Sequence, residues 1–231
     1  ATEMSGPQPG AFLAEAKESK EKAKEDGIAQ SLKVMVFSVN DVYITDNLAK
    51  MRAEVDRIIR EQKPDVYFVT HQGDFLSPSP LSNFDKGANM VKIMNAMKFT
   101  HICIGNHEFD HSLGDVRKRL NELKTAKILA ANINFPYPED YVELKHMRKT
   151  PLELYNCVEH DISELPNGLK LGWVGVCTEE TIAFIKSGGL YSKYEGLTMS
   201  DSIKTAKKVM QRLKAEGCNY IIPLTHLYDS S

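Results

Sequence analysis

The segment CIGNHEFDH, residues 103–111, contains side chains that could support metal chemistry in two ways. From His107 to His111 it matches H-E-x-x-H, in which two histidines one helical turn apart bind zinc and the glutamate is a general base. From Gly105 to Glu108 it reads G-N-H-E, a loop that offers an amide oxygen and an imidazole to a metal centre and its substrate. Both interpretations predict metal chemistry, but on different folds.

The residues before His107 favour the loop interpretation. Gly105 and Asn106 follow the strand-like run at residues 100–104, so we expect His107 at a strand-to-helix turn. The zinc motif of a metalloprotease must instead lie inside a helix, so that both histidines face one ion. Asp110 would also place a second carboxylate within that motif. We therefore interpret the segment as a loop at the end of a strand, with the protease site as the rejected alternative.

Several apolar runs of the chain end in side chains that bind metals. Residues 33–39 lead to Asp41, 65–70 lead through His71 to Asp74, 100–104 lead to Asn106, and 219–224 lead to His226. Ligands of open α/β sheets bind beyond the carboxyl ends of the strands. Each Asp or Asn alone could simply cap a helix, but all four predicted strands are followed by a potential metal ligand. The sequence therefore predicts a site with oxygen and imidazole donors, suited to Mn, Zn, Fe or Mg.

The pattern of apolar residues predicts an α/β fold. Strands are expected at 33–39, 65–70, 100–104, 127–131, 169–176 and 219–224, and helices at 47–62, 84–97, 112–124 and 200–216. Near-continuous apolar strands that alternate with helices indicate sheets covered by helices. Residues 135–151, with three prolines and many charges, are expected to form a long surface connection. Ser77 and Ser79 lie among prolines, which suits a turn.

Composition limits the classes of protein to which the chain could belong. A length of 231 residues suggests one domain at 31–231 preceded by an extension at 1–30, with a charged helix at 11–26. The formal charge of −2 argues against a nucleic-acid scaffold, and no apolar run is long enough for a membrane span. Four widely spaced cysteines slightly favour the cytoplasm, with a secreted or organellar chain left open.

The ordered set of motifs resembles the calcineurin-like metallophosphoesterases. The motifs are Asn40-Asp41-Val42-Tyr43, Gly73-Asp74-Phe75, Gly105-Asn106-His107-Glu108-Phe109-Asp110 and Thr225-His226. Within that superfamily, G-N-H-E-F-D is typical of the 5′-nucleotidase branch. The resemblance covers about residues 31–231. It implies a layered α/β/β/α sandwich that hydrolyses a nucleotide or another small phosphomonoester.

The resemblance also implies a site with two divalent metal ions of unknown identity. Asp41 would bind the first ion, Asp74 would bridge both, and Asn106 and His226 would bind the second. A metal-bound hydroxide would attack the phosphorus atom, because two cations clamp a phosphoryl group and lower the pKa of water between them. The expected partner is a small phosphorylated substrate, and the sequence predicts no particular protein partner.

Two further residues of the loop would act on the substrate. His107 would contact the phosphoryl oxygens or protonate the leaving group, and Asp110 would hold the His107 ring in the required tautomer. His71 could line the site, although a packing role is at least as plausible. His111 is expected in the first turn of a helix, from where it could reach substrate.

Two departures from the family pattern leave alternatives open. The pattern after the first strand is D-x-H, but this chain has Tyr43, which could pack beside the metal, bind it as phenolate, or mark a site that has lost catalysis. A later G-H-x-H motif is absent before Ser231, so we expect the catalytic domain to be incomplete at that end. The alternative function is a degenerate, non-catalytic module that binds a ligand or a protein.

Overall fold

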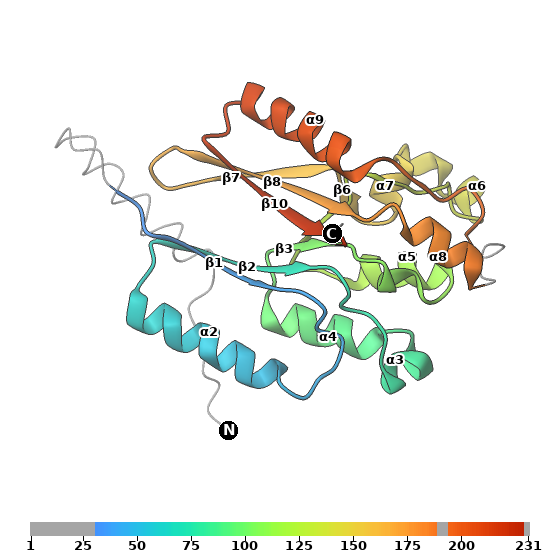
Figure 1. Ribbon diagram of the computed structural model, residues 1–231, viewed down its shortest axis with the longest axis horizontal. Coiled ribbons are helices and arrows are strands. Elements are labelled where there is room, and N and C mark those ends of the chain that lie inside the picture. The colour runs from blue at the N-terminus through green and yellow to red at the C-terminus, as the bar shows by residue number, and fades with distance from the viewer. Residues whose placement is uncertain (1–30, 189–193, 229–231) are drawn as a thin grey trace.

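Two β-sheets lie face to face in the computed structural model, with helices on both outer sides (Figure 1). The structure describes residues 31–188 and 194–228, so the helix expected at 11–26 lies outside the described residues. The strands are β1 (Val34–Val39), β2 (Val66–Gln72), β3 (His101–Cys103), β4 (Lys127–Leu129), β5 (Ile133–Asn134), β6 (Cys157–Val158), β7 (His160–Glu164), β8 (Lys170–Cys177), β9 (Thr198–Met199) and β10 (Tyr220–His226). All six predicted strands are present.

The larger sheet has the strand order β1-β2-β3-β4-β6, and all its neighbouring strands are parallel. The smaller sheet has the order β10-β8-β7, with β10 parallel and β7 antiparallel to β8. Strands β5 and β9 form a short antiparallel pair. Strands β2 and β8 are buried along most of their length, as expected of strands covered on both faces.

The helices agree with the predicted ranges, with one correction. They are α2 (Leu48–Gln62), α3 (Pro80–Asp85), α4 (Ala88–Met97), η1 (His107–Phe109), α5 (Leu113–Glu122), α6 (Tyr141–Leu144), η2 (Lys145–Met147), α7 (Pro151–Leu154), α8 (Thr181–Ser187) and α9 (Ser202–Ala215), where η denotes 3-10 helices. The single helix predicted at 84–97 is wrong, because Lys86 and Gly87 both have positive φ angles, which end α3 and begin α4.

Three clusters of hydrophobic side chains hold the helices and sheets of the described residues together. One cluster packs α2, α4 and α5 against the larger sheet, and a second fills the space between the two sheets around Trp173 and Phe68. The third packs α9 against the smaller sheet through Val209, Leu213 and Val174. Figure 1 shows α2 and α4 on one outer side and α9 on the other. The predicted α/β/β/α sandwich is confirmed.

The two sheets approach each other closely where β4 meets β8. A Cβ atom on Gly175 would lie only 2.4 Å from the Leu129 Cβ, so a side chain there would force the strands apart. Just beyond β4, the buried Asn132 side chain donates to the Cys177 carbonyl oxygen at 2.7 Å and accepts from its N–H at 3.0 Å. This pairing aligns the carboxyl ends of the two sheets, which is where the predicted ligands lie.

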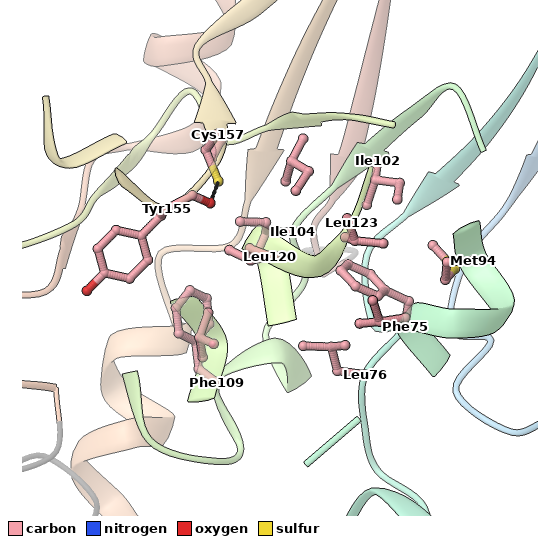
Figure 2. Packing of buried hydrophobic residues seen from close by; sticks show 14 of the residues in the cluster. Phe75, Leu76, Met94, Ile102, Ile104, Phe109, Leu120, Leu123, Tyr155 and Cys157 are labelled. Carbon is pink, nitrogen blue, oxygen red and sulfur yellow. Dashed lines mark hydrogen bonds between the residues drawn. The ribbon is translucent and has the colours of Figure 1, made fainter. Parts of the chain in front are cut away.

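The hydrophobic core extends directly beneath the loops that carry polar residues. Phe75 and Leu76, which follow Asp74, are buried in the same cluster as Ile104 and Phe109, which flank the G-N-H-E loop. Figure 2 shows these four side chains packed together. Each loop is therefore anchored by apolar residues next to its polar ones, so the polar residues cannot move independently of the core.

The surface connection predicted at 135–151 is exposed for most of its length but contains α6 and η2, which the proline and charge content did not predict. The four cysteines are all free, and three of them are buried as small apolar residues. Among the helices that the structure describes, none combines the length and apolarity that crossing a membrane requires.

Candidate metal and phosphate site

Four strands bring their carboxyl ends to one edge of the paired sheets, and each carries a predicted ligand. Asp41 follows β1, Asp74 follows β2, Asn106 follows β3, and His226 is the last residue of β10. Ligand atoms of Asp41, Asp74 and His226 lie within 4.8 Å of one another. The Asn106 side-chain oxygen lies 2.9 Å from Nε2 of His226. The structure thus brings together the four residues that the sequence singled out from distant positions.

The Asp41 and Asp74 backbones adopt an unusual conformation that aims their carboxylates into this cluster. Their φ angles are 56° and 58°, in the left-handed region that a non-glycine residue adopts at an energetic cost. The Asp41 N–H donates to the Gly73 carbonyl oxygen at 3.1 Å, which ties the loop after β1 to the loop after β2. Backbone strain of this kind is characteristic of functional sites.

Two glycines allow the loops after β2 and β3 to touch. A Cβ atom on Gly105 would lie 2.2 Å from Oδ1 of Asp74, and one on Gly73 would lie 2.7 Å from Nδ1 of His226. Either substitution would require the ligands themselves to move. Gly73 and Gly105 are therefore required for a steric reason, because the two loops approach each other too closely at the ligand cluster to leave room for a Cβ atom.

Glu108 holds these loops together from beneath. Its Oε2 accepts from the N–H groups of Asp74 and Gly105 at 2.8 and 2.7 Å, and its Oε1 accepts from those of Phe75 and Leu76 at 2.7 and 3.0 Å. Burial, and after it the Asp74 charge, raise the pKa of Glu108 to about 7, while hydrogen bonds from these backbone N–H groups oppose the shift. Glu108 therefore positions the loops and does not face substrate.

Asp74 uses each carboxylate oxygen differently. Oδ1 accepts from the His107 N–H at 2.8 Å, which fixes the side chain against the next loop. Oδ2 lies 3.2 Å from Nε2 of His226 on the other sheet. The Asp41 carboxylate, in turn, accepts a hydrogen bond from the side chain of Asn40. The carboxylates are thus held by neighbouring donors while their remaining lone pairs face the cluster.

The tautomer of His226 follows from its partners. Nδ1 lies 2.8 Å from the Gln72 carbonyl oxygen, which can only accept, so Nδ1 carries a proton and Nε2 faces the cluster. Burial lowers the pKa of His226, but the hydrogen bond and charge of Asp74 outweigh burial and raise it to about 9. A second proton on Nε2 therefore satisfies the carboxylate in the absence of a cation.

This arrangement suits a divalent cation. A neutral His226 ring would direct its Nε2 lone pair at the Asp74 carboxylate, and two acceptors cannot satisfy each other. Either a proton or a metal ion must lie between them, and oxygen and imidazole donors are the ligands that Mn, Zn and Fe prefer. The residues present therefore fit a metal site.

His107 and Asp110 form a pair beside the cluster. Nδ1 of His107 lies 3.0 Å from Oδ2 of Asp110, so the other ring nitrogen is free to meet a ligand. The Ser77 hydroxyl donates to the Asp110 carboxylate and lies 3.1 Å from the His107 carbonyl oxygen. The loop after Asp74 thereby orients Asp110, which orients His107. Both members of the pair are partly exposed, as contact with a substrate requires.

Two tyrosines lie near residues of the site in space or in sequence. The Tyr43 ring lies beside His107, with ring centroids 6.5 Å apart. Tyr228, two residues beyond His226, makes an edge-to-face contact with Phe184 of α8 at 5.9 Å. Burial, and after it the charge of Asp74, raise the pKa of Tyr228. Tyr43 therefore borders the site next to His107.

The two other histidines predicted as possible site residues lie outside the ligand cluster. His71 is fully buried, its ring packs edge-on against Phe75 and Phe99, and neither ring nitrogen has a hydrogen-bond partner among the described residues. Burial lowers the pKa of His71 to about 4, so the ring is neutral. His111 precedes α5, and burial lowers its pKa too. The contacts of His71 are those of a packing residue.

Two positioning residues were missed by reasoning from sequence. Glu108 was assigned no role in the loop, and Ser77 was assigned only to a turn. The sequence carried no clear signal for Glu108, because its neighbours Asn106, His107 and Asp110 are polar too and do not mark it as buried. No local pattern indicated Ser77, because its partner Asp110 is 33 residues away.

Comparison with known proteins agrees with this geometry. Residues 35–229 match the family described as calcineurin-like phosphoesterase. A cell wall protein of Listeria monocytogenes is 27% identical over 165 residues, which are 67% of this chain and 20% of that protein. The NAD 5′-nucleotidase of Haemophilus influenzae is 28% identical over 158 residues, which are 68% of this chain and 23% of that protein. The chain thus spans less than a quarter of the length of either relative.

Solved structures share the fold. A 5′-nucleotidase precursor from Thermus thermophilus superposes with a TM-score of 0.63 at 20% sequence identity, covering 83% of this chain and 36% of the other. At this identity the similarity concerns the arrangement of the elements alone. The match supports the layered sandwich independently of the motifs.

Proposed function

Because the chain belongs to the calcineurin-like phosphoesterase family, we propose that it hydrolyses phosphoesters of small molecules, a nucleotide or another phosphomonoester, with two divalent cations. The observation that carries the proposal is the convergence of four strand-end ligands beside the His107–Asp110 pair. The names of similar proteins support it, since several are nucleotidases or nucleotide phosphoesterases.

In this proposal four residues hold the cations. Asp41 and Asp74 would hold the first, and Asp74, Asn106 and His226 would hold the second. When bound, a pair of cations neutralises phosphoryl charge and lowers the pKa of water, which supplies a nucleophile at neutral pH. The Gln72 carbonyl keeps a proton on Nδ1 of His226, so that Nε2 is the ligand atom.

His107 acts on the substrate and not on the cations. With Nδ1 held by Asp110, its Nε2 is available to donate a proton to a phosphoryl oxygen or to the departing alkoxide. The Asp110 carboxylate fixes the orientation of the His107 ring, and Ser77 holds Asp110 in place. The oriented N–H group of His107 would then stabilise negative charge that develops on the phosphoryl group in the transition state.

A non-catalytic binding module is the second candidate function. Tyr43 motivates it, because it occupies the position at which the family pattern has a metal-binding histidine. The His107–Asp110 pair favours catalysis, since a domain that only binds has no chemical need for an oriented proton donor. Tyr43→His separates the two functions. Hydrolysis that appears only in this variant would assign the native chain to the second.

The proposal is tested by release of phosphate in the presence and absence of Mn²⁺. The substrates are p-nitrophenyl phosphate, a set of nucleoside 5′-monophosphates and bis-p-nitrophenyl phosphate. We expect turnover that a chelator abolishes and added Mn²⁺ restores, and that falls in His107→Ala. Turnover that is indifferent to chelation, or that persists unchanged in His107→Ala, would contradict the proposed chemistry.

A further inference from the structure

We propose that the Phe184–Tyr228 pair forms a subsite for an aromatic group of the substrate, so that the protein prefers phosphoesters with an aromatic organic group. The inference deepens the proposed function and rests on it. The pair combines Phe184 of α8 with Tyr228, which lies two residues beyond His226 at the end of β10.

The position of the pair is fixed by contacts around His226. The His226 carbonyl oxygen accepts from the Thr178 N–H at 2.8 Å, which ties the segment before α8 to the end of β10. Thr178 also accepts from the N–H of Thr181, the first residue of α8. Tyr228 lies two residues beyond His226. The aromatic pair is therefore joined through short covalent and hydrogen-bonded links to a predicted metal ligand.

The exposure of the two rings indicates an unused apolar surface. Phe184 is 49% and Tyr228 is 52% exposed, although each ring could bury a large apolar area. Their edge-to-face contact, with planes at 81°, keeps both rings partly open to solvent. The other side of α8 is anchored by the buried Thr181 and Ile185, so the helix cannot simply turn Phe184 inward. A third ring could pack against this pair at little cost of reorganisation.

The position of the phosphoryl group at the ligand cluster determines which part of the substrate could reach the Phe184–Tyr228 pair. A phosphoester bound through its phosphoryl group must direct its organic group away from the carboxylates, onto the surface that surrounds them. An aromatic group would find ring faces and edges at the Phe184–Tyr228 pair, where aromatic contacts add to the gain from burial. A short alkyl group would reach too little of this surface to gain from it. Binding energy from this subsite would thus distinguish aromatic from small alkyl esters.

The test compares the dissociation constants of benzylphosphonate and ethylphosphonate, which cannot be hydrolysed, for the Mn²⁺-loaded protein by calorimetry. We expect benzylphosphonate to bind about tenfold more tightly. Phe184→Ala and Tyr228→Ala should each reduce that ratio, and the double variant should bring it to about one. Tyr228→Phe keeps the ring and should keep the ratio, because the inference concerns the ring and not the hydroxyl group.

Tyr220→Ala is the matched control. Tyr220 is 61% exposed and begins β10, whereas Tyr228 follows the end of the same strand, so its loss should leave the ratio unchanged. Equal binding of the two phosphonates by the unmodified protein, failure of both to bind, or a ratio that survives in the double variant would overturn the inference. A ratio that depends on the pair in a protein that hydrolyses no phosphoester would instead contradict the proposed function alone.

Discussion

Nε2 of His226 lies 3.2 Å from Oδ2 of Asp74, although the two residues belong to different sheets and are 152 positions apart. Because the Gln72 carbonyl holds the Nδ1 proton, this contact requires a second proton or a cation. The same contact raises the pKa of His226 to about 9 against the effect of burial. A proton and a metal ion would therefore compete for one place, between a residue of the larger sheet's edge and the last residue of β10.

Asp74→Asn should lower Mn²⁺-dependent phosphate release by at least about a hundredfold, because the amide supplies one neutral oxygen where a carboxylate would bridge two cations. Steady-state kinetics over a range of Mn²⁺ concentrations measures the loss. Glu139→Gln, which changes an exposed carboxylate away from the cluster, is the control. Turnover within a factor of two of the unmodified protein would rule out Asp74 as a bridging ligand.

His107→Gln should lower kcat by about a hundredfold or more while leaving the number of bound cations unchanged, because His107 acts on the substrate and holds no ion. Asp110→Asn should have a smaller effect on kcat, since the carboxylate only holds the His107 ring in its orientation. Kinetics and elemental analysis of the same samples separate these roles. Loss of bound metal in His107→Gln would show that the residue is a ligand instead.

Glu108→Gln should destabilise the fold by about 3 kcal/mol, because the amide nitrogen would replace one carboxylate oxygen and face the two backbone N–H donors that this oxygen accepts from, either those of Asp74 and Gly105 or those of Phe75 and Leu76. Unfolding in denaturant measures the change, and the midpoint should fall without a change of slope. Glu139→Gln again serves as the control for loss of one carboxylate. A free energy of unfolding within about 0.5 kcal/mol of the unmodified protein would contradict the structural role.

The α/β class and the polar strand ends could be predicted because they depend on short-range patterns, whereas the layered arrangement was predicted from the resemblance to the family. The β1, β2, β3 and β10 runs are apolar, and each ends in a potential ligand, so the ligand edge follows from sequence order alone. The break between α3 and α4 was not predicted, because the left-handed conformation of Lys86 has no pattern of its own and an isolated glycine such as Gly87 is tolerated inside a helix. Very short strands such as β5 and β9 also lack a periodic signal.

The hydrogen bonds between the site residues were harder to predict from the sequence than the identity of those residues. The tautomer of His226 depends on the Gln72 carbonyl, and the loop positions depend on Glu108 accepting from four backbone N–H groups. Both are consequences of tertiary structure. The sequence could assign Tyr43 only a set of alternatives, and the structure adds that its ring lies beside His107.

His71→Leu should make the protein less sensitive to acid. Burial lowers the pKa of His71 to about 4, against about 6.5 in the unfolded chain, so the unfolded state binds more protons between these values. Stability from this group is complete above pH 6.5 and is lost as the pH falls towards 4, by about 3 kcal/mol. Leucine removes this loss, and it breaks no hydrogen bond of the described residues because neither ring nitrogen has a partner there.

Denaturant unfolding at pH 7 and pH 4.5 measures this difference. The exposed His146 provides the control variant His146→Gln, which should keep the acid sensitivity of the unmodified protein. An equal loss of stability in His71→Leu and in the unmodified protein would show that His71 is protonated in the folded state, in conflict with its burial.

The most direct test of the site is the number of Mn²⁺ ions bound per chain, measured by equilibrium dialysis and elemental analysis at pH 7.5. We predict two ions for the unmodified protein and fewer for Asp74→Asn, because Asp74 is the ligand that both cations would share. Absence of bound Mn²⁺, Zn²⁺ and Fe²⁺ from the unmodified protein, or undiminished binding in Asp74→Asn, would contradict the assignment of the cluster as a metal centre.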